Sequence, residues 1–257
     1  YNENVRIESV FTEVNHLGEH RKPILIIADE CHLSRANSWV KCIQYYDTFV
    51  VGFTATPVRL DGKPLGDIYE KLITGPSVKY LIENNFLSKY EYYAPMSVDT
   101  DNLKTIAGDY QLNELEKLMC DRKVYSDVIH SYERLAKGEK TIAYCTSIKH
   151  SIETAQEFRA AGYSSAHIDG KTPDSERQRI ISDFRGGKIS VLCNVGIISE
   201  GISIDDVAAC MLLRPTQSLA LHIQQSMRCM RYAPGKTAKI IDCVANYTRH
   251  PLPDDDI

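Results

Sequence analysis

Short apolar runs alternate with amphipathic stretches along much of the chain. The runs are rich in β-branched residues, and the stretches between them repeat apolar residues at helical spacing. In residues 124–137, for example, Val124, Val128, Tyr132 and Leu135 fall on one helical face. This alternation is typical of strand–helix–strand units in a parallel sheet, so we predict an α/β protein.

The units form two sets. The first contains predicted strands at 24–28 and 49–54 and a helix at 78–85. The second contains predicted helices at 124–137, 148–160, 173–185 and 219–231, and strands at 141–145, 164–168, 189–193, 208–213 and 238–244. Residues 95–109 between the sets are polar, so we expect a first domain at 1–96, a second at 97–250 and a solvated, flexible tail at 251–257.

Composition narrows the class of protein. Of the 257 residues, 43% are hydrophobic, enough for a sizeable core, while the net charge of −4 confines any nucleic-acid contact to a local patch. The longest apolar stretches, such as 207–213, are far below the roughly 20 residues of a membrane span, and no signal peptide opens the chain. The eight cysteines include no C-x-x-C pair, which argues against zinc and favours a reducing compartment. We therefore expect a cytoplasmic protein with no membrane partner.

The sharpest local motif is Asp29-Glu30-Cys31-His32, directly after the apolar run 24–28. Open α/β sheets bind ligands at the carboxyl ends of their strands, and two adjacent carboxylates there suit Mg²⁺ and a water nucleophile. Asp29 would hold the metal and Glu30 would orient the attacking water. A helix-capping or surface pair is the alternative. Thr54-Ala55-Thr56-Pro57, after the next predicted strand, favours the functional interpretation.

A second candidate lies on the predicted helix 219–231. Gln224, Arg228 and Arg231 stand at i, i+4 and i+7 and therefore share a face. The apolar stripe that would pack contains Leu219, Ile223, Met227 and Met230. Guanidinium groups fit the charge that develops on a transferred phosphoryl group, although a solvated or salt-bridged arginine face is the bland alternative.

In order and approximate spacing, these motifs resemble those of the superfamily-two helicases. Asp29-Glu30-Cys31-His32 looks like motif II, the DExH box, and Thr54-Ala55-Thr56 like motif III. Residues 142–147, 191–201 and 224–231 resemble motifs IV, V and VI. Details at 56–62, 167–172 and 233–236 look most like bacterial and phage DNA helicases of the DNA-repair type. The resemblance implies two RecA-like domains.

The resemblance also assigns roles to individual residues. It makes Asp29, Glu30, Arg228 and Arg231 catalytic, with Arg231 as the arginine finger. It implies ATP and Mg²⁺ as cofactors, with Asp29 the metal ligand, and a nucleic-acid partner, DNA rather than RNA. The expected nucleotide contacts are His32, Glu200, Gly201 and Gln224, and the expected coupling residues are Thr54 and Thr56. The expected nucleic-acid contacts are Arg59, Thr146, Ser147, Lys171, Thr172, Asn194 and Ser199.

Two positions depart from the family pattern. Met227 stands where motif VI usually has glycine, and it falls on the apolar stripe. Ser203 stands where many relatives have an acidic residue after the motif V glycine. The second departure puts a polar contact to the nucleotide in doubt, although Asp205 or Asp206 could substitute.

Neither Gly-Lys-Thr triplet is a phosphate-binding loop. The pattern G-x-x-x-x-G-K-[ST] needs a glycine where Ser165 precedes Gly170 and where Met230 precedes Gly235. Thr172-Pro173 is predicted to be a helix N-cap followed by proline at the first helical position. Lys171 and the amides of that helix start could hold a nucleic-acid phosphate.

Only 28 residues precede Asp29, too few for the phosphate-loop part of a RecA-like first domain, and the first residue is Tyr. We therefore expect a piece of an ATP-dependent helicase or translocase, with an incomplete first domain and little activity in isolation. Its parent would couple ATP hydrolysis between two RecA-like domains to movement on DNA, in a bacterial or phage-infected cell. The alternatives are a helicase-like module that binds nucleic acid or a protein without ATP turnover, and a metal-dependent hydrolase using Asp29, Glu30 and His32. No oligomer signal is visible.

Overall fold

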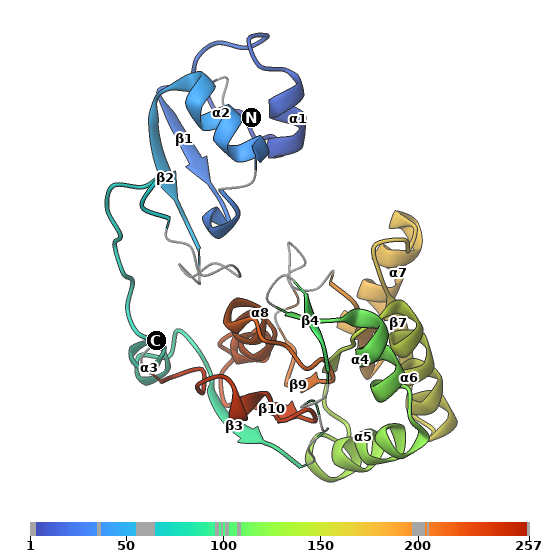
Figure 1. Cartoon of the computed structure of the whole chain (residues 1–257). Coiled ribbons are helices and arrows are strands. Elements are labelled where there is room, and N and C mark those ends of the chain that lie inside the picture. The colour runs from blue at the N-terminus through green and yellow to red at the C-terminus, as the bar shows by residue number, and fades with distance from the viewer. Residues whose placement is uncertain are drawn as a thin grey trace. The chain divides into compact units, whose positions relative to one another are not determined.

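The computed structural model divides the chain into two compact units, residues 1–75 and 76–257 (Figure 1). It describes residues 4–34, 37–54, 65–95, 98, 100, 103–106, 109–196, 204 and 206–255. Within these residues no helix is both long and apolar enough to cross a membrane.

In its described part, the first unit is a strand–helix–strand unit with an additional α-helix and a short 3₁₀ helix. Its elements are α1 (Val10–Asn15), β1 (Leu25–Ala28), the 3₁₀ helix η1 (Cys31–Leu33), α2 (Asn37–Tyr46) and β2 (Phe49–Gly52). The strands pair in parallel, from Leu25 opposite Phe49 to Ala28 opposite Gly52, with α2 in the crossover. The Ser9 hydroxyl accepts a hydrogen bond from the Thr12 amide and caps α1.

One face of this two-stranded sheet is apolar and uncovered. Ile27 is 64% exposed and Phe49 is 82% exposed, while Leu25 and Val51 on the same face are also exposed. Strands of parallel sheets are usually buried on both faces. The described part of the first unit therefore presents a hydrophobic surface formed by alternate strand residues.

The second unit contains a six-stranded sheet in which every pairing is parallel. The strand order is β3-β10-β9-β6-β8-β7. The strands are β3 (Lys89–Tyr93), β6 (Thr141–Tyr144), β7 (Ser165–Ile168), β8 (Val191–Asn194), β9 (Ala209–Leu212) and β10 (Thr237–Asp242). A short antiparallel hairpin pairs β4 (Thr105–Ile106) with β5 (Asp109–Tyr110).

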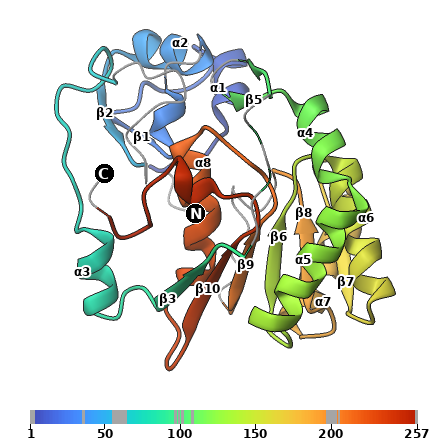
Figure 2. The same ribbon diagram turned by 60° about the horizontal axis from the view of Figure 1, so that its bottom comes forward.

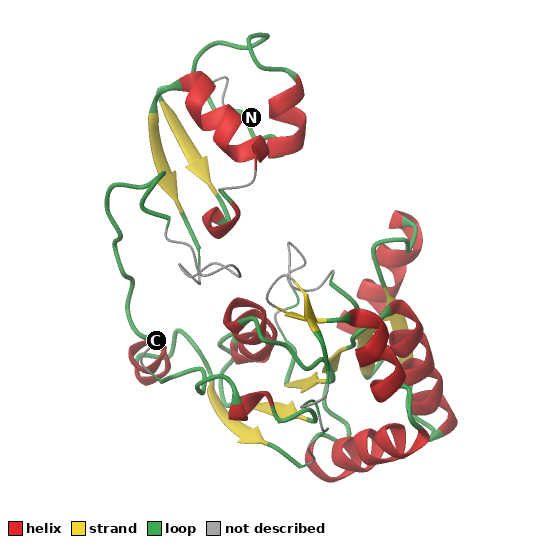
Figure 3. Cartoon of the chain, in the orientation of Figure 1, coloured by secondary structure: helices red, strands yellow, loops and turns green. Residues whose placement is uncertain are grey.

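Helices cover both faces of this sheet (Figure 3). They are α3 (Val78–Glu83), α4 (Leu112–Met119), α5 (Arg122–Leu135), α6 (Ile148–Ala160), α7 (Asp174–Arg185), α8 (Leu219–Ser226) and the 3₁₀ helices η2 (Met227–Met230) and η3 (Asn246–Thr248). Side chains of α4, α5 and α6 share one core with strand residues such as Ala143 and Met211. Side chains of α7 and η2 share the other with the alternate residues Ile142 and Cys210. Figure 2 shows α5 and α6 lying side by side.

The predicted α/β class and most of the second-domain elements are confirmed. The helix predicted at 148–160 has those limits, and the other predicted strands and helices outside 219–231 end within about two residues of the observed ones. The reason is that their apolar residues recur with the period of a strand or a helix, so that they fall on the face that packs against the core.

The domain boundary lies at 75/76, about twenty residues before the predicted one. Residues 89–93 form the edge strand β3, which pairs with β10, and α3 packs Val78 and Ile82 against the second unit's core. The sequence of β3, Lys-Tyr-Glu-Tyr-Tyr, contains no apolar run that would predict a strand, because its tyrosines combine an apolar ring with a polar hydroxyl. The Tyr92 hydroxyl donates to Asp242 Oδ2 at 2.9 Å.

The expected solvated tail is ordered in its described part. Pro253 is buried, and the Tyr90 hydroxyl of β3 donates a hydrogen bond to Asp254 Oδ1. The Leu252 amide donates to Asp255 Oδ2 at 2.7 Å. Residues 251–255 therefore belong to the second unit, since Asp254 and Asp255 accept hydrogen bonds within it.

Candidate functional site

The acidic pair lies directly after β1, as the sequence predicts. Asp29 Oδ1 accepts a hydrogen bond from the Glu30 amide at 2.9 Å, and Glu30 adopts the left-handed conformation with φ of 50°. A non-glycine residue in this region is uncommon and carries a backbone cost of about 1 kcal/mol or more. The chain turns sharply here, and the Cys31 amide donates to the Phe53 carbonyl at 2.9 Å after β2.

A side-chain contact joins the two predicted motifs of the first unit. His32 Nδ1 lies 3.0 Å from Thr54 Oγ1 and 3.3 Å from Glu30 Oε2. The imidazole is therefore shared between the carboxylate after β1 and the hydroxyl after β2. The side chains of the loops that follow β1 and β2 therefore meet at this imidazole.

The acidic pair has a donor set that fits Mg²⁺. Carboxylate oxygens are the ligands that Mg²⁺ prefers, and it is usually held by one or two of them together with nucleotide phosphates. Glu30 Oε2 is buried, and among the described residues it has no hydrogen bond beyond its 3.3 Å ion-pair contact with His32 Nδ1, so this oxygen can still accept a further bond. Among the described residues there is no group of three or more His, Cys, Asp or Glu side chains that could hold a metal alone.

Gly52 allows the acidic loop to pack against β2. A Cβ at this position would lie 2.7 Å from both Cβ and Sγ of Cys31 and 2.8 Å from Cε1 of Tyr69. Cys31 is only 4% exposed, and the Tyr69 hydroxyl bonds to Ser34 Oγ at 2.8 Å. In the loop after β1, Cys31 thus packs closely against Gly52, and Ser34 is held by its hydrogen bond to Tyr69.

Gly52→Ala should lower the free energy of unfolding of the first unit by about 1–3 kcal/mol, because the added methyl group overpacks this contact. Trp39, the single tryptophan of the chain, lies in α2, so its fluorescence during urea unfolding follows this unit. Gly66→Ala is the matched control, since a Cβ there meets no atom within 4 Å. Equal unfolding midpoints for the two variants would contradict the packing argument.

The predicted helix 219–231 is shorter than expected. It ends at Ser226 and tightens into the 3₁₀ helix η2, and Arg231 follows in extended conformation with φ of −51° and ψ of 133°. The Ser226 hydroxyl donates to the His222 carbonyl at 2.7 Å, a local bond that competes with regular helix geometry. Gln224, Arg228 and Arg231 therefore do not form a single helical face, which corrects the prediction.

The two arginines nevertheless lie in one short segment at the second unit's sheet. Burial raises the pKa of the Tyr144 hydroxyl of β6, and the positive charge of the Arg228 guanidinium opposes this effect. Gln224, Arg228 and Arg231 are all partly exposed. Met227 is partly buried against the core on the α7 side, so its departure from glycine is explained by packing.

Two predicted nucleic-acid contacts are buried. The Thr146 side chain is 1% exposed and bonds His150 Nδ1 at 2.9 Å, and Asn194 is 1% exposed and donates to the Ala143 carbonyl at 3.1 Å. Ser147 accepts from the His150 amide and caps α6. In this conformation the Thr146 and Asn194 side chains stabilise the ends of β6 and β8 and cannot reach a phosphate, which corrects that expectation.

The turn before α7 also differs from the prediction. Asp169 Oδ1 accepts from the amides of Lys171 and Thr172 at 2.8 and 2.9 Å, and Thr172 Oγ1 accepts from the Asp169 amide. Pro173, and not Thr172, occupies the N-cap. These two amides are therefore unavailable to a phosphate, and the exposed Lys171 ammonium remains as the candidate contact.

Burial raises the pKa of the Asp169 carboxyl, but hydrogen bonds from the Lys171 amide, His167 and Thr172 outweigh it, so the net pKa is lowered. The Asp169 carboxylate is consequently charged at neutral pH and can hold this turn.

Five predicted residues lie outside the described part of the chain: Thr56, Arg59, Ser199, Glu200 and Gly201. Ser203 and Asp205 lie outside it as well.

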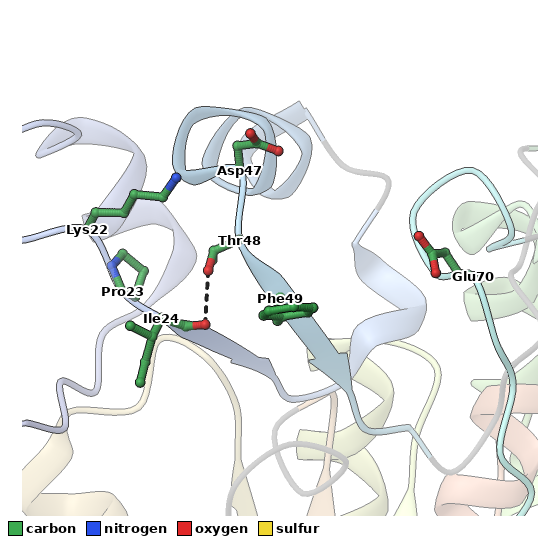
Figure 4. A pocket seen from close by; sticks show the side chains of 7 residues that line it. All are labelled: Lys22, Pro23, Ile24, Asp47, Thr48, Phe49 and Glu70. Carbon is green, nitrogen blue, oxygen red and sulfur yellow. Dashed lines mark hydrogen bonds between the residues drawn. The ribbon is translucent and has the colours of Figure 1, made fainter.

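A surface depression of the first unit lies away from these residues. It is formed at the starts of β1 and β2, whereas Asp29 and Glu30 follow the end of β1. Within it, the Thr48 hydroxyl donates a hydrogen bond to the Ile24 carbonyl at 3.0 Å (Figure 4). Its lining residues are Lys22, Pro23, Ile24, Asp47, Thr48, Phe49 and Glu70. No predicted site residue is among them.

Two residues that the sequence did not single out hold the segment containing α8 and η2. Before α8, Asp109 accepts from Arg214, Thr216 and the Gln217 amide at 3.1, 3.1 and 2.9 Å. After η2, the Ser88 hydroxyl donates to the Arg231 carbonyl at 3.2 Å. Both partners are more than 100 positions away in sequence, so no local pattern could have revealed them.

Buried imidazoles in the second unit make its stability sensitive to pH. Burial lowers the pKa of His150 and of His222 to about 4, and it lowers the pKa of His250 as well. His222 stacks on His250 with ring centroids 5.0 Å apart, and neither of its ring nitrogens has a hydrogen-bond partner among the described residues. Unfolding would return each imidazole to its ordinary pKa near 6.5.

The free energy of unfolding should therefore fall as the pH drops from about 6.5 towards 4, because the unfolded chain binds protons that the folded chain does not. The expected loss is on the order of 3 kcal/mol for each strongly shifted imidazole. Urea unfolding followed by circular dichroism at several pH values measures it. His222→Leu should flatten the slope, whereas His20→Gln in an exposed loop should not. A slope unaffected by His222→Leu would contradict the assignment.

The fold and the site residues define a RecA-like α/β protein with a carboxylate pair in one unit and arginines in the other. Two family models match the chain: the type III restriction enzyme res subunit at residues 5–59 and the helicase conserved C-terminal domain at residues 122–233. Together these two matches support a fragment of a superfamily-two helicase.

The relatives agree with this placement. A 51.5 kDa protein of a Lactococcus phage (isolate 7-9) is 43% identical over 97% of this chain and 55% of its own length. Irc3 of Saccharomyces cerevisiae, assigned as an ATP-dependent helicase, is 28% identical over 94% of this chain and 37% of its own length.

A solved fragment from Vibrio vulnificus, assigned as the HsdR subunit of a type I restriction enzyme, has the same fold. It is 21% identical, has a TM-score of 0.74, and the match covers 95% of this chain and 49% of that one. The chain thus spans about half the length, or less, of these proteins.

Proposed function

We propose that the chain is part of a nucleic-acid-stimulated ATPase that moves on DNA. The observation that carries this proposal is the contact of His32 with both Glu30 and Thr54, which joins the acidic loop to the loop after β2. Both units would act on one bound ATP. The first supplies carboxylates and the second supplies guanidinium groups.

The residues divide the chemistry as follows. Glu30 accepts a proton from, and orients, the water that attacks the terminal phosphorus of ATP, while His32 holds the Glu30 side chain in place. Arg231 stabilises the charge that develops on the phosphoryl oxygens, and Arg228 makes a second contact. Asp29 would hold Mg²⁺, which when bound neutralises phosphate charge. When the Glu30 side chain moves during hydrolysis, its contact through His32 with Thr54 transmits this movement to the loop that follows β2.

The proposed partner is DNA in preference to RNA, because the match to the restriction-enzyme res subunit family includes the acidic loop. The strand would be held mainly through its phosphates, and the proposed contacts are Arg59, Ser147, Lys171 and Ser199. Glu200, Gly201 and Gln224 are the proposed additional nucleotide contacts, and Thr56 a further coupling residue. Binding through phosphates weakens steeply with salt, because bound counterions are released.

The second candidate is a module that binds nucleic acid or a protein without ATP turnover. It is favoured by one observation, namely that G-x-x-x-x-G-K-[ST] does not occur in the 257 residues. Without that loop, these 257 residues alone would bind the ATP phosphates weakly.

One experiment separates the two candidates. ATP hydrolysis by the complete gene product is measured with no nucleic acid, with single-stranded DNA, with duplex DNA and with RNA, at about 50 and 200 mM salt. The proposal expects Mg²⁺-dependent hydrolysis that DNA stimulates more than RNA, with an apparent DNA affinity that falls at higher salt. Salt-dependent binding with no turnover in any arm would establish the second candidate.

A further inference from the structure

The segment that enters the second unit from the first is bonded to the backbone around Arg231. Leu87 and Arg231 form an antiparallel bridge, and the Ser88 amide donates to the Met230 carbonyl at 2.8 Å. Both residues immediately precede β3, the edge strand next to β10. The sheet therefore fixes their position on one side.

The Ser88 side chain completes this attachment. Its hydroxyl donates to the Arg231 carbonyl at 3.2 Å and accepts from the Ala233 amide at 3.2 Å. Ser88 is 3% exposed, so water cannot readily replace either bond. Because a serine hydroxyl has a single proton, donation to Arg231 and acceptance from Ala233 together fix its rotation.

Arg231 needs such a support because no helix holds it. The 3₁₀ helix η2 ends at Met230, and Arg231 is already extended. A guanidinium group that acts on a phosphoryl group must be placed accurately, and a displacement of about 1 Å can cost 10²-fold in rate. The Ser88 bonds hold the backbone on both sides of this residue.

The support itself is anchored at both ends. Val78 and Ile82 of α3 pack against the second unit's core, and Asn85 turns the chain with φ of 59° before Leu87. Lys89 then begins the pairing with β10. The Ser88 hydroxyl is therefore mounted between a packed helix and a strand.

We propose that Ser88 is a positioning residue for Arg231, acting on ATP hydrolysis through the backbone of the arginine and without touching the nucleotide. This inference rests on the proposed function. It assigns a role to the joining segment 76–88 beyond that of a connection.

The test is a double-mutant cycle on the nucleic-acid-stimulated ATPase of the complete gene product, with Ser88→Ala, Arg231→Ala and the pair. Ser88→Ala should lower kcat about ten- to a hundredfold with little change in KM for ATP. In the Arg231→Ala background it should have no further effect on kcat. Ser77→Ala is the matched control, since Ser77 caps α3 in the same segment but does not contact Arg231.

Three outcomes would overturn the inference: an unchanged kcat for Ser88→Ala, an equal loss for Ser77→Ala, or a loss of the same size with and without Arg231. The last would mark a general structural effect, as would a fall in kcat that merely follows a lower unfolding midpoint. If Arg231→Ala itself leaves kcat unchanged, the proposed function fails first, and that failure is visible independently of Ser88.

Discussion

Arg231→Ala should lower the nucleic-acid-stimulated kcat for ATP hydrolysis by about 10³–10⁵-fold. The guanidinium group stabilises charge that exists mainly in the transition state, so the loss should fall on kcat more than on KM for ATP. Steady-state hydrolysis by the complete gene product, with saturating single-stranded DNA, measures both constants. DNA binding should persist, because the proposed phosphate contacts lie elsewhere.

Arg134→Ala provides the control for this variant. Arg134 lies in the last turn of α5 and is exposed, so its removal takes away the same charge without disturbing the segment after α8. Arg231→Lys should recover little of the lost rate, since an ammonium group lacks the planar, forked donors of arginine. A kcat for Arg231→Ala equal to that of Arg134→Ala would exclude an arginine finger at this position.

Glu30→Gln should lower kcat by about 10²–10⁴-fold while leaving the binding of ATP and DNA largely intact. Glutamine has nearly the same shape as glutamate, and its carbonyl oxygen can keep the contact that Glu30 Oε2 makes with His32 at 3.3 Å. It cannot, however, accept a proton from the attacking water. Single-turnover hydrolysis with excess protein isolates this step from product release.

This substitution should change the free energy of unfolding little, because glutamate and glutamine bear a similar cost in the left-handed backbone conformation at position 30. The urea midpoint reported by Trp39 checks this point. Glu19→Gln, in an exposed loop of the same unit, is the charge-matched control. Hydrolysis by Glu30→Gln at the rate of Glu19→Gln would remove Glu30 from the mechanism.

The elements that sequence predicts well are those whose burial follows a regular period. Strands β6, β8 and β9 are buried throughout and were anticipated as apolar runs, and α6 was anticipated within its observed limits. Strand β3 was missed because a tyrosine can pack its ring partly against the core while its hydroxyl bonds a carboxylate, as Tyr92 does with Asp242. A hydrophobicity pattern does not register this combination.

The candidate site divides in the same way. Asp29 and Glu30 were predictable, since a strand end fixes where the following residues lie. The end of α8 was not, because it depends on Ser226 bonding carbonyls of the preceding turn, a choice that the apolar stripe does not reveal. The resemblance assigns Thr146 and Asn194 outward roles, but the Thr146 hydroxyl contacts the buried His150 ring and the Asn194 side-chain amide donates to the Ala143 carbonyl of β6.

The position of β3 has a consequence for exchanging parts between relatives. A chimera joined at residue 97, where the composition changes, would take the second unit without its edge strand and leave one side of β10 unpaired. It would also replace Leu87 and Ser88 with foreign residues opposite Arg231. Recombination that preserves the second unit, whether natural or engineered, should therefore cross over near residue 75, where the described contacts divide.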